Sequence, residues 1–307
     1  MNQLKNNLCI YIMCHNRPDE TRQVIRSVLA QSDLEFKLTV SDNSSNDEVK
    51  ALLQSEFPDV SYVRRKSNLS ALDHFNCCID EVSGTHFCLF HDDDLMQPDF
   101  VKEVKAAIRR FPQAVAIGSN ALIETQGAMQ QRPSFISRHQ YESITSVRDL
   151  AARYFAHNQS GIAPFPGYVY RKDLVGSARF RTSEGKYSDV TWLLRLREKG
   201  PMLWIRRPLM TYRLHGGNDG GVESRRDRLR FLAYLKAHRH VLGEGLLQDY
   251  RSSFIYKPVT QSVSPIQATR QANAVRFVRF CRFIRYLRGD TYVALMHRAA
   301  VKWMPSL

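Results

Sequence analysis

The segment HFCLFHDDDLMQPDF, residues 86–100, decides the fold of this chain. A mainly apolar run, His86–Phe90, leads into three consecutive aspartates, Asp92, Asp93 and Asp94. An apolar run of this kind is typical of a strand covered on both faces, as the strands of parallel sheets are. Residues that follow such a strand lie at the carboxyl edge of the sheet, where open α/β sheets bind their ligands.

The same alternation extends through the first 120 residues. Short apolar runs predict strands, and longer amphipathic segments between them predict helices. We expect Val24, Val28 and Leu29 on the apolar face of the first helix, and Gly84 just past the end of the third. The strands are expected over 8–13, 37–41, 60–64, 86–90 and 114–118, and the helices over 19–31, 46–57, 70–82 and 99–111. This order predicts βαβ units with right-handed crossovers and a mostly parallel sheet.

The pattern is weaker after Asn120. Residues 121–165 are mixed in character and are expected to be rich in loops. Further on, the pattern predicts a strand and turn over 167–175, a helix over 188–200, a short strand over 202–205 and a basic helix over 225–240. Beyond residue 243 we expect mainly helices.

Composition places the chain among soluble globular proteins. It has 307 residues, of which 43% are hydrophobic and 24% are charged. The sequence has no apolar stretch of the ~18 residues that a spanning helix needs and no recognisable signal peptide, so we expect a cytoplasmic location. None of the six cysteines forms a CxxC pair, which favours reduced thiols.

The net charge of +14 predicts a polyanionic partner: nucleic acid, anionic lipid or a phosphorylated ligand. The densest basic segment is RFVRFCRFIRYLR, residues 276–288. Its arginines recur every third residue and do not form one helical stripe, but aromatic residues alternate with them. We therefore predict contact with an anionic membrane surface; a packed helix with exposed arginines is the alternative. No base-stacking platform is visible, so nucleic acid is not an expected partner.

The three aspartates predict a metal and diphosphate site. Neighbouring carboxylates repel one another and raise each other's pKa. A divalent cation relieves that repulsion, and Mg²⁺ and Mn²⁺ prefer oxygen ligands. The alternative is a solvated acidic loop in which Asp94 or Asp99 caps the next helix.

Five segments in order resemble motifs of the family 2 glycosyltransferases, which have the GT-A fold. They are CIYIMCHNRPDETRQVIRSVLAQ, KLTVSDNSSND, FCLFHDDDLMQPDF, KYSDVTWLLRLREKG and PLMTYRLHGGN, and the resemblance covers about residues 8–220. It implies an α/β GT-A fold with a mostly parallel central sheet flanked by helices and a Rossmann-like nucleotide-binding half. It also implies a glycosyltransferase domain over 1–222, with a nucleotide-sugar half (about 1–120) and an acceptor half (about 121–222), and a basic, mainly helical region over 223–307.

The resemblance assigns site residues by position. Asp42 matches the acid that contacts the nucleotide base, and a role as a turn-forming aspartate is the alternative. His91 stands where the family often has an aspartate and is expected to support the ligands. The implied nucleotide-sugar-binding residues are Asn16, Arg17, Asp42, Arg64, Asp92, Asp93 and Arg213, and the implied ligands of Mn²⁺ or Mg²⁺ are Asp92, Asp94 and His215.

Asp189 matches the catalytic base of the family. A sugar hydroxyl attacks well only as its proton is removed, and a positioned carboxylate can accept that proton. The helix N-terminus is expected to favour the anionic form of Asp189. The alternative is that Asp189 caps the helix, in competition with Ser188. Trp192, on the same helix, is expected either to line the acceptor pocket or to belong to the core.

The activity implied is inverting, metal-dependent transfer of a hexose. The donor would be a UDP-, GDP- or dTDP-linked sugar, and the acceptor a hydroxyl of a saccharide or a lipid-linked molecule in cell-envelope polysaccharide biosynthesis. The expected location is the cytoplasm, at the inner face of the plasma membrane if residues 276–288 bind it. One alternative is a nucleotidyltransferase, although the segment CHNRPDET lacks the glycine-rich loop of that class. Another is a catalytically silent homologue that acts as a scaffold.

Overall fold

The computed structural model describes residues 7–66, 69–130, 133–155, 161–215, 224–247 and 250. The chain divides into two compact units, one of residues 1–147 and 160–223, the other of residues 148–159 and 224–307. The basic segment 276–288 lies outside the described residues, and the assignment of functional domains stays a prediction.

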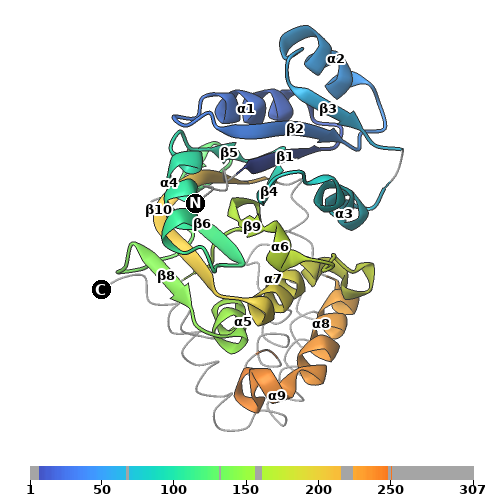
Figure 1. The fold of residues 1–307 in the computed structure, drawn as a ribbon. Coiled ribbons are helices and arrows are strands. Elements are labelled where there is room, and N and C mark those ends of the chain that lie inside the picture. The colour runs from blue at the N-terminus through green and yellow to red at the C-terminus, as the bar shows by residue number, and fades with distance from the viewer. Residues whose placement is uncertain are drawn as a thin grey trace, which may run out of the picture. The chain divides into compact units, whose positions relative to one another are not determined.

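The first part of the larger unit is a parallel sheet built from βαβ units (Figure 1). Its strands lie in the order β3-β2-β1-β4, and every neighbouring pair among them is parallel. The strands are β1 (Leu8–Cys14), β2 (Phe36–Asp42), β3 (Ser61–Arg64) and β4 (His86–His91), and the helices between them are α1 (Pro18–Leu29), α2 (Glu48–Glu56) and α3 (Ala71–Glu81). The predicted strands and helices of this region are confirmed to within a few residues.

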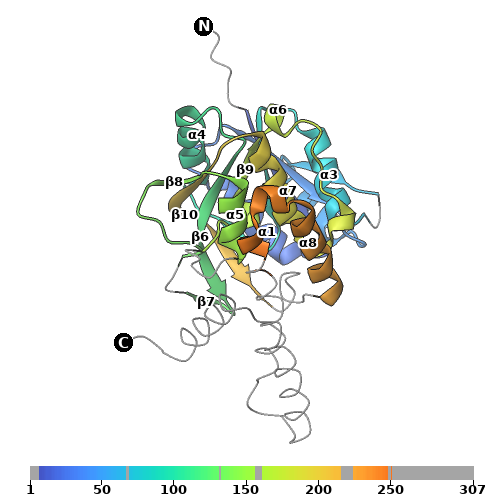
Figure 2. The same cartoon turned by 90° about the horizontal axis from the view of Figure 1, so that it is seen from below.

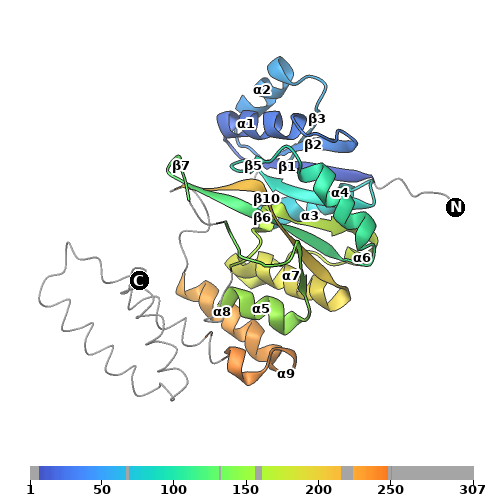
Figure 3. The same cartoon turned by 90° about the vertical axis from the view of Figure 1, so that its left-hand side faces the viewer.

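The sheet continues through two long strands, β6 (Ala116–Thr125) and β10 (Met202–Leu214), which run parallel and side by side (Figure 2). The main path through the sheet is β3-β2-β1-β4-β9-β6-β10-β5, and two further short strands pair with β6 and β10 off this path. Figure 3 labels β6, β10 and β5. The shorter strands pair antiparallel: β5 (Leu95–Met96), β7 (Ala128–Met129), β8 (Tyr141–Ile144) and β9 (Val169–Arg171). Most paired residues lie in parallel ladders, so the predicted α/β class with a mostly parallel sheet is confirmed.

Helices cover both faces of the sheet. Leu8, Ile10 and Ile12 of β1 point to one face, where they share a buried core with α1, α2 and α4 (Phe100–Arg110). The opposite face of β1 packs against α3. Burial of this apolar surface is the main stabilising contribution to the fold. The four parallel strands end at one edge, and this edge holds the candidate site.

Two details of the helices differ from expectation. Ile25, not Leu29, completes the buried face of α1, and Leu29 is 45% exposed. At about 100° per residue, Leu29 falls at the margin of the stripe that contains Val24 and Val28. Gly84 does not terminate α3, because the helix ends at Glu81 and its C-cap residue is Val82. It is required instead by close packing, because a Cβ there would lie 2.2 Å from the Asn7 carbonyl oxygen.

The expectation of a loop-rich region over 121–165 was wrong in part. The strand expected over 114–118 continues to Thr125, and the region also contains β7, β8 and α5 (Val147–Phe155). The short strand expected over 202–205 is likewise the beginning of the longer β10. The other predicted elements are present as β9, α6 (Lys172–Val175) and α7 (Ser188–Lys199).

The described part of the smaller unit is helical. The predicted basic helix appears as α8 (Arg225–Ala237) and α9 (Arg239–Leu242), with His238 between them. Over the part of the chain that the structure describes, no helix is both long and apolar enough to cross a bilayer. None of the cysteines in this part forms a disulfide.

Candidate active site

The carboxyl ends of β1, β2 and β4 meet around a pocket of about 390 Å³ in the larger unit. Its lining includes the predicted residues Arg17, Asp92 and Asp93, together with His91 and Tyr212. The location is the edge where ligands of open α/β sheets bind. The sequence prediction of a ligand site after β4 therefore coincides with a real cavity.

Asp92 is buried and is held by the loop that follows β1. Its Oδ2 accepts a hydrogen bond from the backbone N–H of His15 at 2.9 Å, and its Oδ1 lies 3.3 Å from Nη1 of Arg17. Burial raises the pKa of Asp92 to about 6, although the His15 N–H and Arg17 act in the opposite direction. Asp92 thus stabilises the loop as well as lining the pocket.

Asp93 lies between two basic side chains. Nη1 of Arg17 donates to Oδ2 of Asp93 at 2.8 Å, and Nε2 of His215 lies 3.1 Å from the same oxygen. His215 therefore comes to the acidic cluster from the end of β10, as expected if it is part of the site.

Asp94 is completely buried and only partly satisfied. Its Oδ1 accepts a hydrogen bond from the backbone N–H of Arg213 at 3.0 Å. Its Oδ2 has no hydrogen-bond partner among the described residues. Burial, followed by the charge of Asp93, raises the pKa of Asp94 well above its ordinary value. An unpaired oxygen in such a place is costly, and a cation would satisfy it.

Three residues could hold a cation: His91, Asp93 and Asp94. The atoms that would bind it lie within 4.8 Å of one another. Carboxylate oxygens with one imidazole suit Mn²⁺ or Mg²⁺. The residues present therefore fit a divalent cation. The sequence analysis predicted Asp92, Asp94 and His215 as the metal ligands. Only Asp94 belongs to both groups, because the structure groups it with His91 and Asp93.

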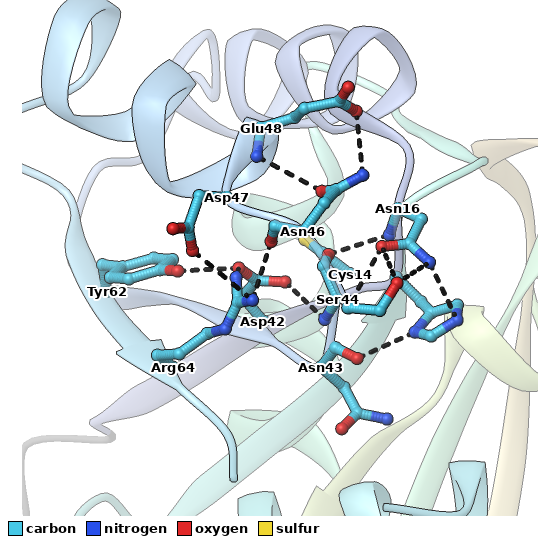
Figure 4. A network of polar contacts seen from close by, with 12 residues as sticks. Cys14, Asn16, Asp42, Asn43, Ser44, Asn46, Asp47, Glu48, Tyr62 and Arg64 are labelled. Atoms are coloured by element: carbon cyan, nitrogen blue, oxygen red, sulfur yellow. Dashed lines mark hydrogen bonds and ion pairs between the residues drawn. The ribbon is translucent and has the colours of Figure 1, made fainter. Parts of the chain in front are cut away.

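Asp42, at the end of β2, is the centre of a second polar network (Figure 4). Its Oδ1 accepts from the backbone N–H of Ser44 at 2.8 Å. Its Oδ2 accepts from the hydroxyl of Tyr62 at 2.7 Å and from Nη1 of Arg64 at 2.6 Å. Burial alone would raise the pKa of Asp42, but these hydrogen bonds hold it below its ordinary value. Asp42 is therefore a fixed, ionised acceptor.

The loop after β1 connects this network to the acidic cluster. Asn16 has a φ of 55°, and its backbone N–H donates to Oγ of Ser44 at 2.8 Å. The Asn16 side chain also exchanges hydrogen bonds with Ser45 (Figure 4). One residue earlier, the ring of His15 contacts the carbonyl oxygen of Asn43 at 2.8 Å. The backbone that carries Arg17 is thus tied to β2 on one side and to Asp92 on the other.

Two arginines that the resemblance implies in nucleotide-sugar binding, Arg64 and Arg213, contact acidic side chains outside the acidic cluster. The guanidinium of Arg64 contacts Asp42 and the Asn46 carbonyl oxygen. The side chain of Arg213 lies 3.7 Å from Glu124, while its backbone supports Asp94. The structure brings Arg17 into direct contact with the acidic cluster, whereas the guanidinium of Arg64 pairs with Asp42.

Asp189 is the second residue of α7, and its side chain does not cap the helix, because the N-cap position belongs to Tyr187. Its Oδ1 accepts the backbone N–H of Val190 at 2.8 Å. The helix N-terminus was expected to favour the anion. Burial outweighs that effect and raises the pKa of Asp189 to about 6. A carboxyl group with such a pKa can both lose and accept a proton near neutral pH.

Tyr212 lies within electrostatic range of both Asp189 and the acidic cluster. This tyrosine lines the pocket on β10. Its pKa is raised to about 12, first by burial and then by the negative charges of Asp94, Asp93 and Asp189. All three carboxylates are therefore within electrostatic range of one phenol.

Trp192 has no exposed surface. Its ring stacks on Phe180 with centroids 4.4 Å apart and meets the edge of Tyr170. A side chain enclosed in this way cannot touch an acceptor, so its position fits the alternative of a core residue.

Sequence reasoning did not single out several residues of the site. Tyr62 and Arg64 are two apart on β3, so they point to the same face, and this spacing could have identified Tyr62 as a partner of the same acid. Tyr212 directly precedes Arg213 in the last motif. No pattern in the sequence indicates the contact of His15 with Asp92, because the two residues are 77 positions apart.

Comparison with known proteins shows which family the chain belongs to. The family model described as "Glycosyl transferase family 2" matches residues 9–168, just over half of the chain. None of the curated protein sequences compared with the chain is similar to it.

The chain is similar in structure to TarS of S. aureus. One TarS structure has a TM-score of 0.60 at 11% identity; the match covers 94% of this chain and 50% of TarS, so the chain spans half the length of that protein. TarS 1–349 in complex with UDP-GlcNAc has a TM-score of 0.61 at 10% identity, with coverages of 94% and 83%. The complex of the same fragment with UDP has a TM-score of 0.54 at 10% identity, with coverages of 96% and 91%. The predicted GT-A fold is confirmed by this likeness.

Proposed function

Because the chain belongs to glycosyl transferase family 2, we propose that it transfers a sugar from a nucleoside diphosphate to an acceptor hydroxyl with the help of a divalent cation. The observation that carries this proposal is the buried Oδ2 of Asp94, which has no hydrogen-bond partner among the described residues. Asp93, the residue before it, lines the pocket. His91, Asp93 and Asp94 would hold the cation. When bound, it would offset the charge that develops on the leaving diphosphate.

The nucleoside would lie at the Asp42 end of the loop that follows β1. Asp42 is ionised and fixed by three donors, and Asn43 and His15 line the pocket beside it. UDP is the nucleotide that we favour, because the TarS complexes contain UDP-GlcNAc and UDP. The transferred sugar is then expected to be a hexose or a hexosamine.

Asp189 would act as the base. The acceptor oxygen forms a bond to the anomeric carbon while the bond from that carbon to the diphosphate oxygen breaks. The acceptor proton passes to the Asp189 carboxylate, and attack from the opposite face inverts the anomeric configuration. With a pKa of about 6, the carboxylate is mainly ionised at neutral pH and still basic enough to accept the proton.

The acceptor is proposed from the sequence alone. The basic segment 276–288 favours a substrate at an anionic membrane surface. A lipid-linked saccharide of the cell envelope meets this requirement, and it would place the protein at the cytoplasmic face of the plasma membrane.

The test combines binding and turnover. UDP-, GDP- and dTDP-sugars are screened with Mn²⁺ or Mg²⁺ for thermal stabilisation and for release of the nucleoside diphosphate. We expect one donor to stabilise the protein only with a cation and to be hydrolysed slowly. Asp189→Asn should keep the stabilisation and lose about 10²-fold or more in turnover. Glu198→Gln, an exposed change on the same helix, is the matched control.

Three results would contradict the proposal. Binding of a donor with no turnover in wild type would favour the silent scaffold. Release of pyrophosphate from a nucleoside triphosphate would favour a nucleotidyltransferase. Equal turnover in Asp189→Asn and wild type would remove Asp189 from the chemistry.

A further inference from the structure

Arg17 occupies part of the site that a cation would need. One nitrogen, Nη1, lies 2.8 Å from Oδ2 of Asp93 and 3.3 Å from Oδ1 of Asp92. Burial opposes the charge of Arg17, yet the two carboxylates hold its pKa above the ordinary value. In this structure the guanidinium is therefore the counter-charge of the acidic cluster.

The overlap with the cation site occurs at Asp93. This residue belongs to the group of candidate ligands with His91 and Asp94. Its Oδ2 is already in contact with Arg17 and with His215. A divalent cation at this carboxylate would stand a few ångströms from the positive guanidinium, and charges that close repel strongly in a buried site.

From this overlap we infer that Arg17 is a positioning residue that excludes the cation from the acidic cluster until the donor's diphosphate draws its side chain away. The inference rests on the proposed function. If Arg17 acts in this way, the cation alone binds weakly to the protein. The cation and the nucleotide then strengthen each other's binding. This coupling is reciprocal by thermodynamic necessity.

The local structure allows the side chain to move while its backbone stays fixed. The carbonyl oxygen of Arg17 accepts the N–H of Thr21 in the first turn of α1. The two residues before it are held by Asp92, Asn43 and the Ser44–Ser45 segment. The side chain itself is 32% exposed, so water is available to it during exchange. Its planar fork suits a phosphate as well as a carboxylate.

The experiment measures Mn²⁺ affinity with and without UDP, by calorimetry or by the electron paramagnetic resonance signal of free Mn²⁺. Wild type is compared with Arg17→Gln and Arg17→Lys. Arg22→Gln is the control, because Arg22 lies on α1, whose N-cap residue is Arg17, and pairs with Asp19 and Glu56.

We expect Arg17→Gln to bind Mn²⁺ alone roughly tenfold more tightly than wild type, because the competing charge is gone. UDP should increase the Mn²⁺ affinity of wild type more than that of Arg17→Gln. Arg17→Lys should be intermediate, because an ammonium keeps the charge without the fork. Arg22→Gln should match wild type.

Two results overturn the inference and can be told apart. If Arg17→Gln binds Mn²⁺ no more tightly than wild type while UDP still binds with Mn²⁺, the inference fails and the proposed function stands. If no variant binds UDP with any cation, both fail. Arg17→Lys provides the same comparison if Arg17→Gln does not fold.

Discussion

At the scale of single residues, Asp42 and Asp94 show how differently two fully buried carboxylates can be treated. Three donors from the chain satisfy Asp42, and its pKa is lowered. Asp94 receives one backbone donor, one of its oxygens has no partner among the described residues, and its pKa is raised. The described residues satisfy both oxygens of Asp42 but only one oxygen of Asp94.

The first prediction concerns metal removal. In the presence of EDTA, Asp94→Asn should melt a few degrees above wild type, because it removes a poorly compensated charge worth about 1 kcal/mol. With UDP present, added Mn²⁺ should raise the melting temperature of wild type but not of Asp94→Asn. Asp59→Asn, which removes one exposed carboxylate, is the control. A variant that melts below wild type in EDTA and still gains stability from Mn²⁺ would contradict this.

The second prediction concerns pH. The base form of Asp189 is lost as pH falls through its pKa of about 6. At saturating donor and cation, the turnover rate should therefore be level above that pH and fall about tenfold per pH unit below it. A profile measured between pH 5 and 8 tests this. A rate that stays flat down to pH 5 would show that Asp189 does not accept the proton.

At the scale of elements, the parallel half of the sheet was predicted well because its central strands, β1 and β4, are almost uninterrupted apolar runs. The predicted strand over 202–205 was shorter than β10, and this difference also has a physical reason. Exposed Arg206 and Arg207 and the following Pro208 interrupt the run, and the register with β6 shifts at this point. A rule that ends strands at charged residues cannot see that the strand resumes beyond an irregularity.

The third prediction concerns the packing of β1 against the start of β4. Gly84→Ala should lower the free energy of unfolding by about 1–3 kcal/mol, because the new methyl group would overlap the Asn7 carbonyl and the Cys9 sulfur. Denaturant unfolding measures this. Gly245→Ala is the control, since nothing lies within 4 Å of a Cβ there. Equal stability of both variants would refute this account of Gly84.

At the scale of the whole molecule, the acidic residues of the candidate site could be predicted from the sequence, but the side chains that each of them contacts could not. Their position after a buried strand is visible in the sequence. Which carboxylate turns toward Arg17 depends on loops that only the folded sheet brings together. The contact of Arg64 with Asp42 depends on the pairing of β3 with β2. Side-chain direction at such contacts leaves no periodic pattern in the sequence.

The net charge of +14 leads to the fourth prediction. The chain should float with vesicles that contain anionic lipid and not with neutral ones. Replacement of Arg276, Arg279, Arg282, Arg285 and Arg288 by Gln, or removal of residues 270–307, should abolish this, since each basic residue near the surface contributes about 1 kcal/mol. Unchanged flotation of both variants would exclude membrane attachment through this segment.

The central claim is that a divalent cation at Asp94 holds the diphosphate of a nucleotide whose base lies near Asp42. Anomalous diffraction from crystals grown with Mn²⁺ and UDP tests it most directly. The account predicts a manganese peak within bonding distance of Asp94 Oδ2, with the diphosphate against it and the uracil beside Asp42. Nucleotide bound elsewhere, or manganese absent from Asp94 while UDP is present, would contradict it.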